Sequence, residues 1–130
     1  MSVDAVTLDP VVAQLGAVRR RYPDARVEVS ADGQRVLIVP NVPIRAGWNK
    51  NAAAIFFLVP VGYPQVKLDC FYVDADLRLA NGEQPGQSAI QQVFGSSYLW
   101  FSWHITEWNP ANASLDQYVR VCEARLREVR

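Results

Sequence analysis

The chain has 130 residues, which is enough for one domain with a sizeable hydrophobic core. Half of its residues are hydrophobic, a fifth are charged, and its formal net charge at pH 7 is zero. This composition is typical of a globular protein, and it lacks the basic surplus that binding to nucleic acid phosphates requires. We therefore expect one domain over residues 1–130 whose main partner is not a nucleic acid.

Signals for a membrane or an oxidising compartment are missing from the sequence. Every apolar run is shorter than the roughly 20 residues of a membrane-spanning helix, and the N-terminus lacks the basic and apolar blocks of a signal peptide. Two cysteines are too few for a disulfide framework, and with a single histidine we expect no structural metal site and no cofactor. These features predict a cytosolic protein.

The first predicted element is an amphipathic helix over Pro10–Tyr22. Asp9 is a favourable N-cap residue, and proline is well tolerated in the first helical turn. Apolar residues then recur at helical spacing, and three consecutive arginines near the end favour the helix dipole. Pro23 ends the helix.

A β-hairpin is predicted next. Arg26–Ser30 alternates between polar and apolar residues, and Asp32-Gly33 is typical of a tight hairpin turn. Gln34–Val39 then returns as the second strand, in which we expect Val36 and Ile38 to face the core.

Two further strands and a long loop form the centre of the chain. Ala52–Val59 is a nearly continuous apolar run, and Val66–Val73 follows it after the turn residues Gly62-Tyr63-Pro64. Strict alternation in the fourth strand would give one face to Leu68, Cys70 and Tyr72. Asp74–Ser88 is polar and irregular, and loops of this length often carry functional residues.

The signals weaken after this loop. Ser88 as N-cap and Gly95 as a stop favour a short helix over Ala89–Phe94. The aromatic segment Tyr98–Ile105 receives no assignment.

The C-terminal helix is well defined. Ser114 and Gln117 match a capping box, and an apolar stripe follows that contains Leu115, Tyr118, Val119, Cys122, Leu126 and Val129. The elements in order predict an α+β fold, with an N-terminal helix, a four-stranded antiparallel meander, a long loop and a C-terminal helix.

Few side chains are suited to nucleophilic or acid–base chemistry. Cys70 lies in a predicted strand and Cys122 on the apolar stripe of a helix, so both are more often small core residues than nucleophiles. His104 lies among aromatic residues, where a packed histidine is more common than a general base. In the loop, Asn81 belongs to a turn dipeptide and Ser88 suits a helix cap, so each has a structural interpretation as well as a catalytic one.

Several short motifs, spread over nearly the whole chain, resemble the ubiquitin-conjugating enzyme superfamily, and specifically a bacterial branch, family E. The motifs are Gly47-Trp48-Asn49-Lys50, Val61-Gly62-Tyr63-Pro64, Leu77-Arg78-Leu79-Ala80-Asn81-Gly82, Trp100-Phe101-Ser102-Trp103-His104 and Trp108-Asn109-Pro110. The resemblance implies partners found with that branch: a ubiquitin-like protein, a ThiF-like activating enzyme and a JAB-type peptidase. It also implies a role in defence, which the genomic company of such proteins suggests.

The chain departs from the superfamily pattern at the expected nucleophile. The His-Pro-Asn tripeptide that precedes the catalytic cysteine is missing, and only Asn81 could supply its amide. Counting forward from Tyr63 by the superfamily spacing leads to Ser88, and no cysteine lies between Cys70 and Cys122. A serine hydroxyl needs an adjacent base, because it is essentially never ionised at neutral pH.

Two functions follow from this resemblance. The chain could be an acyl carrier in which Ser88 accepts the ubiquitin-like C-terminus as an oxyester, His104 is the base and Asn81 stabilises the oxyanion. It could instead be a non-catalytic adaptor that binds the ubiquitin-like protein or the activating enzyme. A third hypothesis places the nucleophile on Cys70.

Overall fold

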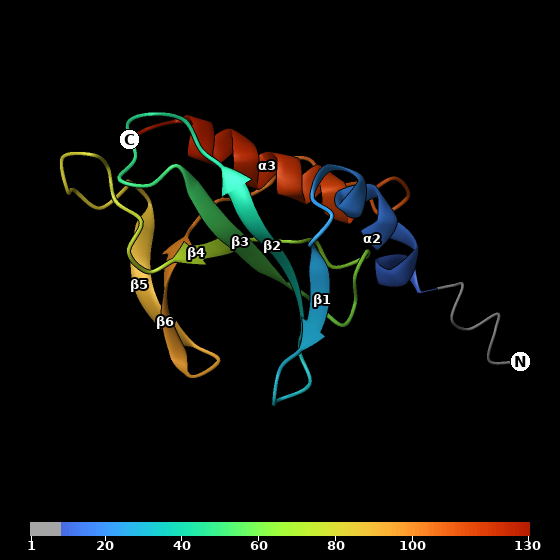
Figure 1. Cartoon of the computed structure of the whole chain (residues 1–130). Helices are drawn as coiled ribbons and strands as arrows, with labels where there is room; N and C mark the ends of the chain where they lie inside the picture. Colours follow the sequence, from blue (N-terminus) through green and yellow to red (C-terminus); the bar gives the residue numbers. More distant parts are fainter. Residues whose placement is uncertain (1–8) are drawn as a thin grey trace, which may run out of the picture.

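The computed structural model describes residues 9–130 (Figure 1). Its elements are α2 (Pro10–Arg21), β1 (Arg26–Val29), β2 (Arg35–Pro43), β3 (Ala52–Val59), β4 (Phe71–Asp74), β5 (Ser88–Val93), β6 (Ser96–Phe101) and α3 (Leu115–Arg127). The six strands form one antiparallel sheet in the order β1-β2-β3-β4-β6-β5. No helix within residues 9–130 is long and apolar enough to cross a membrane.

The core lies between the sheet and α3, which crosses one face of the sheet (Figure 1). The apolar stripe of α3 is buried, and Tyr118 packs edge-on against Phe57 of β3 at a ring-centroid distance of 4.9 Å. The β3 run is apolar throughout because strands flank it on both sides and its α3-facing side chains are fully enclosed. Helix and sheet therefore share a single core, as the predicted α+β fold requires.

Both predicted helices are confirmed with their caps. The Asp9 carboxylate accepts a hydrogen bond from the Val11 N–H at 2.9 Å, and α2 ends one residue before the predicted Tyr22. Ser114 and Gln117 form the predicted capping box at the start of α3. Local side-chain signals thus fix the helix termini correctly.

The predicted inward face of β2 is wrong. Leu37 and Val39, which oppose Phe57 and Ile55 of β3, are the fully buried residues beneath α3. Val36 and Ile38 belong to the opposite face. Alternation identifies the two sets of side chains, but only the packing against α3 decides which set faces the core.

The fourth strand is shorter than predicted. It begins at Phe71, because Cys70 adopts a left-handed backbone conformation with a φ of 60° that interrupts the extended chain. Leu68, Phe71 and Val73 are therefore the buried residues, and the predicted common face of Leu68, Cys70 and Tyr72 does not form.

The predicted helix over Ala89–Phe94 is also wrong, since β5 and β6 form a hairpin there. The hairpin adds two strands to the predicted four, with β6 next to β4 and β5 at the edge of the sheet. The hairpin turns at Phe94 and Gly95, with φ values of 51° and 78°. Such turns usually carry Asn-Gly, because asparagine and glycine tolerate positive φ. Here a phenylalanine, which rarely adopts positive φ, takes the place of the asparagine, so the sequence gives no turn signal. Ser88 is consequently the first residue of β5 and not a helix cap.

Leu126 tests the packing of α3. It is 1% exposed, so Leu126→Ala removes a buried side chain and should lower the free energy of unfolding by roughly 2–5 kcal/mol in urea denaturation. The control Val12→Ala, on the exposed side of α2, should change it by less than about 0.5 kcal/mol. Equal effects of the two substitutions would show that Leu126 is not a core residue.

Candidate active site

A chain of hydrogen bonds connects a carboxylate, an imidazole and a hydroxyl. His104 Nδ1 lies 2.5 Å from Asp69 Oδ1, and His104 Nε2 lies 3.4 Å from Ser102 Oγ. An ionised carboxylate can only accept, so the neutral imidazole carries its proton on Nδ1 and presents an unprotonated Nε2 to the hydroxyl. This is the order of groups in a serine–histidine–aspartate triad. The contact to the hydroxyl is long, as nucleophile–base pairs without substrate commonly are.

Neighbouring strands of the sheet bring the three side chains together. Asp69 precedes β4, whereas Ser102 and His104 follow β6, and β4 pairs with β6. The pairing continues past the strand ends, because the Cys70 N–H donates to the Trp103 carbonyl at 3.1 Å. The backbone thereby holds the carboxylate segment against the imidazole segment.

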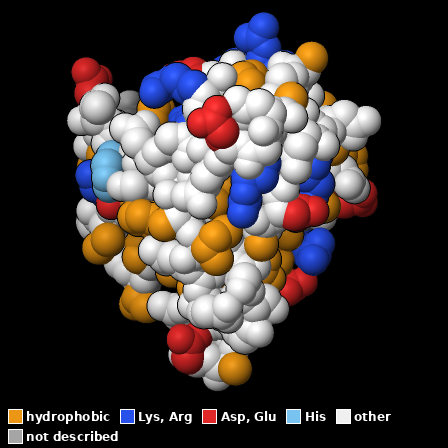
Figure 2. Space-filling model, turned by 90° about the vertical axis from the view of Figure 1, so that its left-hand side faces the viewer, with side chains coloured by type: hydrophobic (Ala, Val, Ile, Leu, Met, Phe, Trp, Pro, Cys, Tyr) orange, Lys and Arg blue, Asp and Glu red, His pale blue; other side chains and the backbone are white. Residues whose placement is uncertain are grey.

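The site is open to solvent. The side chains of His104 and Asp69 are 55% and 40% exposed, and the histidine lies on the surface in Figure 2 (pale blue). At this exposure the hydrogen bond between His104 and Asp69 contributes little stability, so its main effect is to fix the orientation and tautomer of the ring. An open site can accept a group carried by another protein.

Cys70 lies next to this triad. Its sulfur, an Asp69 carboxylate oxygen and a His104 ring nitrogen all lie within 4.8 Å of one another. Burial raises the pKa of the Cys70 thiol, and the negative charge of Asp69 acts in the same direction. The thiol is therefore not poised as a thiolate. The pKa of Cys122 is raised far more, because this residue is completely buried in the core.

Ser88 and Asn81 are engaged elsewhere. Ser88 Oγ donates to the Pro85 carbonyl at 2.5 Å, and Asn81 bonds both the carboxylate and the N–H of Glu83. Within residues 9–130 no hydrogen bond joins either residue to His104. Of the three predicted site residues, only His104 lies in the triad, and the catalytic roles of Ser88 and Asn81 stay predictions.

Sequence reasoning missed Ser102 and Asp69. Ser102 and His104 stand two residues apart, a spacing that places side chains on the same side of an extended chain. That signal could have identified the pair. No local signal relates either residue to Asp69, because only the pairing of β4 with β6 brings it close.

Comparison with known proteins identifies the family. A family model described as prokaryotic E2 family E matches residues 20–129. The chain belongs to this family. We found no match to it among curated proteins or among solved structures.

The Gly47–Lys50 segment anchors the long loop. The Gly47 carbonyl accepts from the Ala80 N–H at 2.7 Å, and Asn49 Oδ1 accepts from the Arg78 N–H at 2.9 Å. Trp48 Nε1 donates to the Leu126 carbonyl of α3 at 2.9 Å. This segment thus has a structural role and joins the loop to α3.

Arg125 of α3 supports the segment that carries Ser102. Its side chain is fully buried, and its guanidinium lies 4.9 Å from the centroid of Phe101 and 5.3 Å from that of Trp103, the residues on either side of Ser102. It also donates to the Gly86 carbonyl at 2.8 Å, and to the carbonyls of Glu128 and Arg130. Burial lowers the pKa of this guanidinium, which nevertheless keeps its charge because an arginine pKa lies so high.

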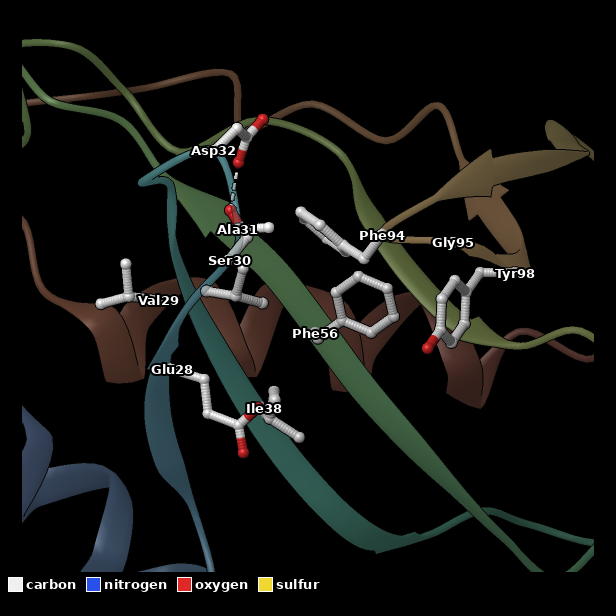
Figure 3. Close-up of a pocket in the computed structure, with 11 residues that line it drawn as sticks. Glu28, Val29, Ser30, Ala31, Asp32, Ile38, Phe56, Phe94, Gly95 and Tyr98 are labelled. Carbon is white, nitrogen blue, oxygen red and sulfur yellow. Dashed lines mark hydrogen bonds between the residues drawn. The ribbon is translucent and has the colours of Figure 1, made fainter.

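A hollow of about 530 Å³ lies on the sheet face away from α3. Figure 3 shows the rings of Phe56, Phe94 and Tyr98 gathered at one side of it, with Glu28 and Asp32 at the other. It adjoins the Phe94–Gly95 turn, at the opposite end of β6 from Ser102. Its lining residues include no cysteine and no histidine.

Arg125→Lys tests the support that this side chain provides. Lysine keeps the charge but cannot reach three carbonyls with a planar fork, so the free energy of unfolding should fall by about 2 kcal/mol or more in urea denaturation. The control Arg127→Lys changes an exposed residue of the same helix and should have an effect below about 0.5 kcal/mol. An Arg125→Lys protein as stable as the wild type would contradict the assigned role.

Proposed function

We propose that this chain is an E2-type acyl carrier in a ubiquitin-like conjugation pathway. It accepts the C-terminus of a ubiquitin-like protein from a ThiF-like activating enzyme and passes it to an amine, and a JAB-type peptidase reverses the modification. Membership of the prokaryotic E2 family E supports a conjugating-enzyme-like role in general.

A single observation carries the catalytic part of the proposal: the His104 imidazole is bonded to Asp69 on one side and faces the Ser102 hydroxyl on the other. A serine hydroxyl becomes a useful nucleophile only when a base removes its proton during attack. Ser102 has such a base, and Ser88 donates its hydroxyl proton to a backbone carbonyl instead. Ser102 is therefore the acceptor that the geometry favours.

The acyl group moves from a thioester to the Ser102 hydroxyl in a step that needs no redox partner. Ser102 Oγ attacks the acyl carbon of the thioester on the activating enzyme, and its proton moves to His104 Nε2. The carbon–sulfur bond then breaks, and the leaving thiolate takes the proton from the imidazolium. Asp69 stabilises the transient positive charge on the ring. The product is an oxyester on Ser102 and a free thiol on the activating enzyme.

Asn81 would have to leave Glu83 to stabilise the oxyanion. Its amide donates to the Glu83 carboxylate at 2.5 Å, and both side chains are exposed, so the bond can exchange at low cost. We retain Asn81 as the oxyanion donor in the proposal, delivered by movement of the loop when the ubiquitin-like tail binds.

The proposal predicts an adduct that survives thiol reductant and is cleaved by mild alkali, formed with the activating enzyme, ATP and the ubiquitin-like protein. Ser102→Ala should abolish this adduct, and Ser102→Cys should give one that reductant cleaves. His104→Gln should slow its formation by about 100-fold or more, because general-base catalysis contributes that much. Gel electrophoresis with and without reductant measures all three effects.

Ser88→Ala is the matched control, since it also removes a serine hydroxyl, from the first residue of the neighbouring strand β5. The adduct should form normally in this variant. Loss of the adduct in Ser88→Ala but not in Ser102→Ala would make Ser88 the acceptor, as the superfamily spacing predicts. A reductant-sensitive adduct that is lost in Cys70→Ala would assign the reaction to the thiol. If the chain binds the ubiquitin-like protein or the activating enzyme but forms no adduct, the result would favour the non-catalytic adaptor function.

A further inference from the structure

Three different zinc-binding groups meet beside the Ser102 hydroxyl. The Cys70 sulfur, a His104 ring nitrogen and an Asp69 carboxylate oxygen all lie within 4.8 Å of one another. Within residues 9–130 no other group of three histidine, cysteine or acidic side chains lies so close. Sulfur, imidazole and carboxylate groups are the ligands of zinc in proteins, and three protein ligands with a water in the fourth position are typical of zinc sites that keep an open position.

We propose that Asp69, Cys70 and His104 bind a Zn²⁺ ion, and that this ion switches off acyl transfer by taking His104 away from Ser102. The binding of the ion is independent of the proposed function. The switching rests on the proposed function. It arises because an imidazole that donates its lone pair to zinc cannot accept a proton from the Ser102 hydroxyl.

The distances require only small side-chain movements. In a tetrahedral zinc site neighbouring ligand atoms are about 3.3–3.8 Å apart, given bond lengths near 2.0–2.3 Å. The side chains of Asp69 and His104 are partly exposed, so solvent leaves room for them to shift, and their 2.5 Å contact can open when the metal enters. The hydrogen bond from Cys70 to Trp103 already holds the two chain segments in register.

The charges also match. Zinc displaces the thiol proton to solvent and forms a zinc–sulfur bond, so the thiolate and the Asp69 carboxylate together neutralise Zn²⁺. Without the metal a thiolate at this place is disfavoured by burial and by the neighbouring carboxylate, which is why the pKa of the Cys70 thiol is raised. A divalent cation removes the second of these penalties. The left-handed backbone of Cys70, unusual for a residue other than glycine, is the kind of local strain that clusters at functional sites.

Cobalt titration of the metal-free full-length chain tests the binding. Co²⁺ should bind one to one and give a near-ultraviolet thiolate-to-metal absorption that Zn²⁺ then abolishes. Cys70→Ser should lose the absorption and weaken Zn²⁺ binding by about 100-fold or more, since losing a ligand costs at least as much as losing a residue that orients one. His104→Ala should weaken binding similarly. Cys122→Ala is the control and should bind as the wild type does, because Cys122 is completely buried.

Absence of the thiolate absorption, or equal Zn²⁺ affinity in the wild type and in Cys70→Ser, would overturn the metal site.

The switching is tested in the adduct assay, with the activating enzyme shown to keep its own activity in Zn²⁺. Zinc should block adduct formation by the wild type but not by Cys70→Ala. A wild type that binds Zn²⁺ yet still forms the adduct would overturn the switch alone. If Zn²⁺ binds but no adduct ever forms, the carrier function fails and the metal site stands.

Discussion

A buried arginine holds the site together. Arg125 projects from α3 into the core, where three backbone carbonyls and two aromatic faces replace the water that its guanidinium loses. Its Nε is the one buried side-chain polar atom within residues 9–130 that has no hydrogen-bond partner, so the enclosure has a real cost. That cost is offset because one side chain fixes both Gly86, just before β5, and the two aromatic residues around Ser102. The position of the hydroxyl therefore depends on the packing of α3.

The sequence predicts those parts of the fold that local chemistry decides. The caps at Asp9 and Ser114 and the apolar run of β3 each carry a short-range signal, and the structure confirms them. Besides the inverted face of β2, the errors occur where the backbone adopts positive φ in residues other than glycine. Cys70 shortens β4, and Phe94 makes a hairpin turn that no turn dipeptide announces. In both cases tertiary packing overrides local preference, which a reading of propensity cannot detect.

The site is predictable only in part, for the same reason. Aromatic neighbours made His104 look like a packed residue, yet more than half of its side chain is exposed. Superfamily spacing pointed to Ser88, whereas the hydroxyl beside the imidazole is Ser102, one position past the residue that opposes Ser88 across the hairpin. Had Ala89–Phe94 been recognised as a strand, the pairing of β5 with β6 would have placed both serines at the same end of the sheet. The wrong secondary structure thus hid Ser102 as a second candidate beside Ser88, whose catalytic role stays a prediction.

The exposure of the triad has a further consequence for the chemistry. Electrostatic stabilisation of a transition state is strong only where water is excluded, and the side chains of His104 and Asp69 are too exposed for that in the isolated chain. Water would also compete with an amine for an oxyester formed there. Both problems disappear if the ubiquitin-like tail and the activating enzyme cover the site as they bind, because the substrate itself then excludes solvent. A weakly activated hydroxyl is an advantage in that setting, since it remains unreactive until the partner that carries the acyl group also completes the site.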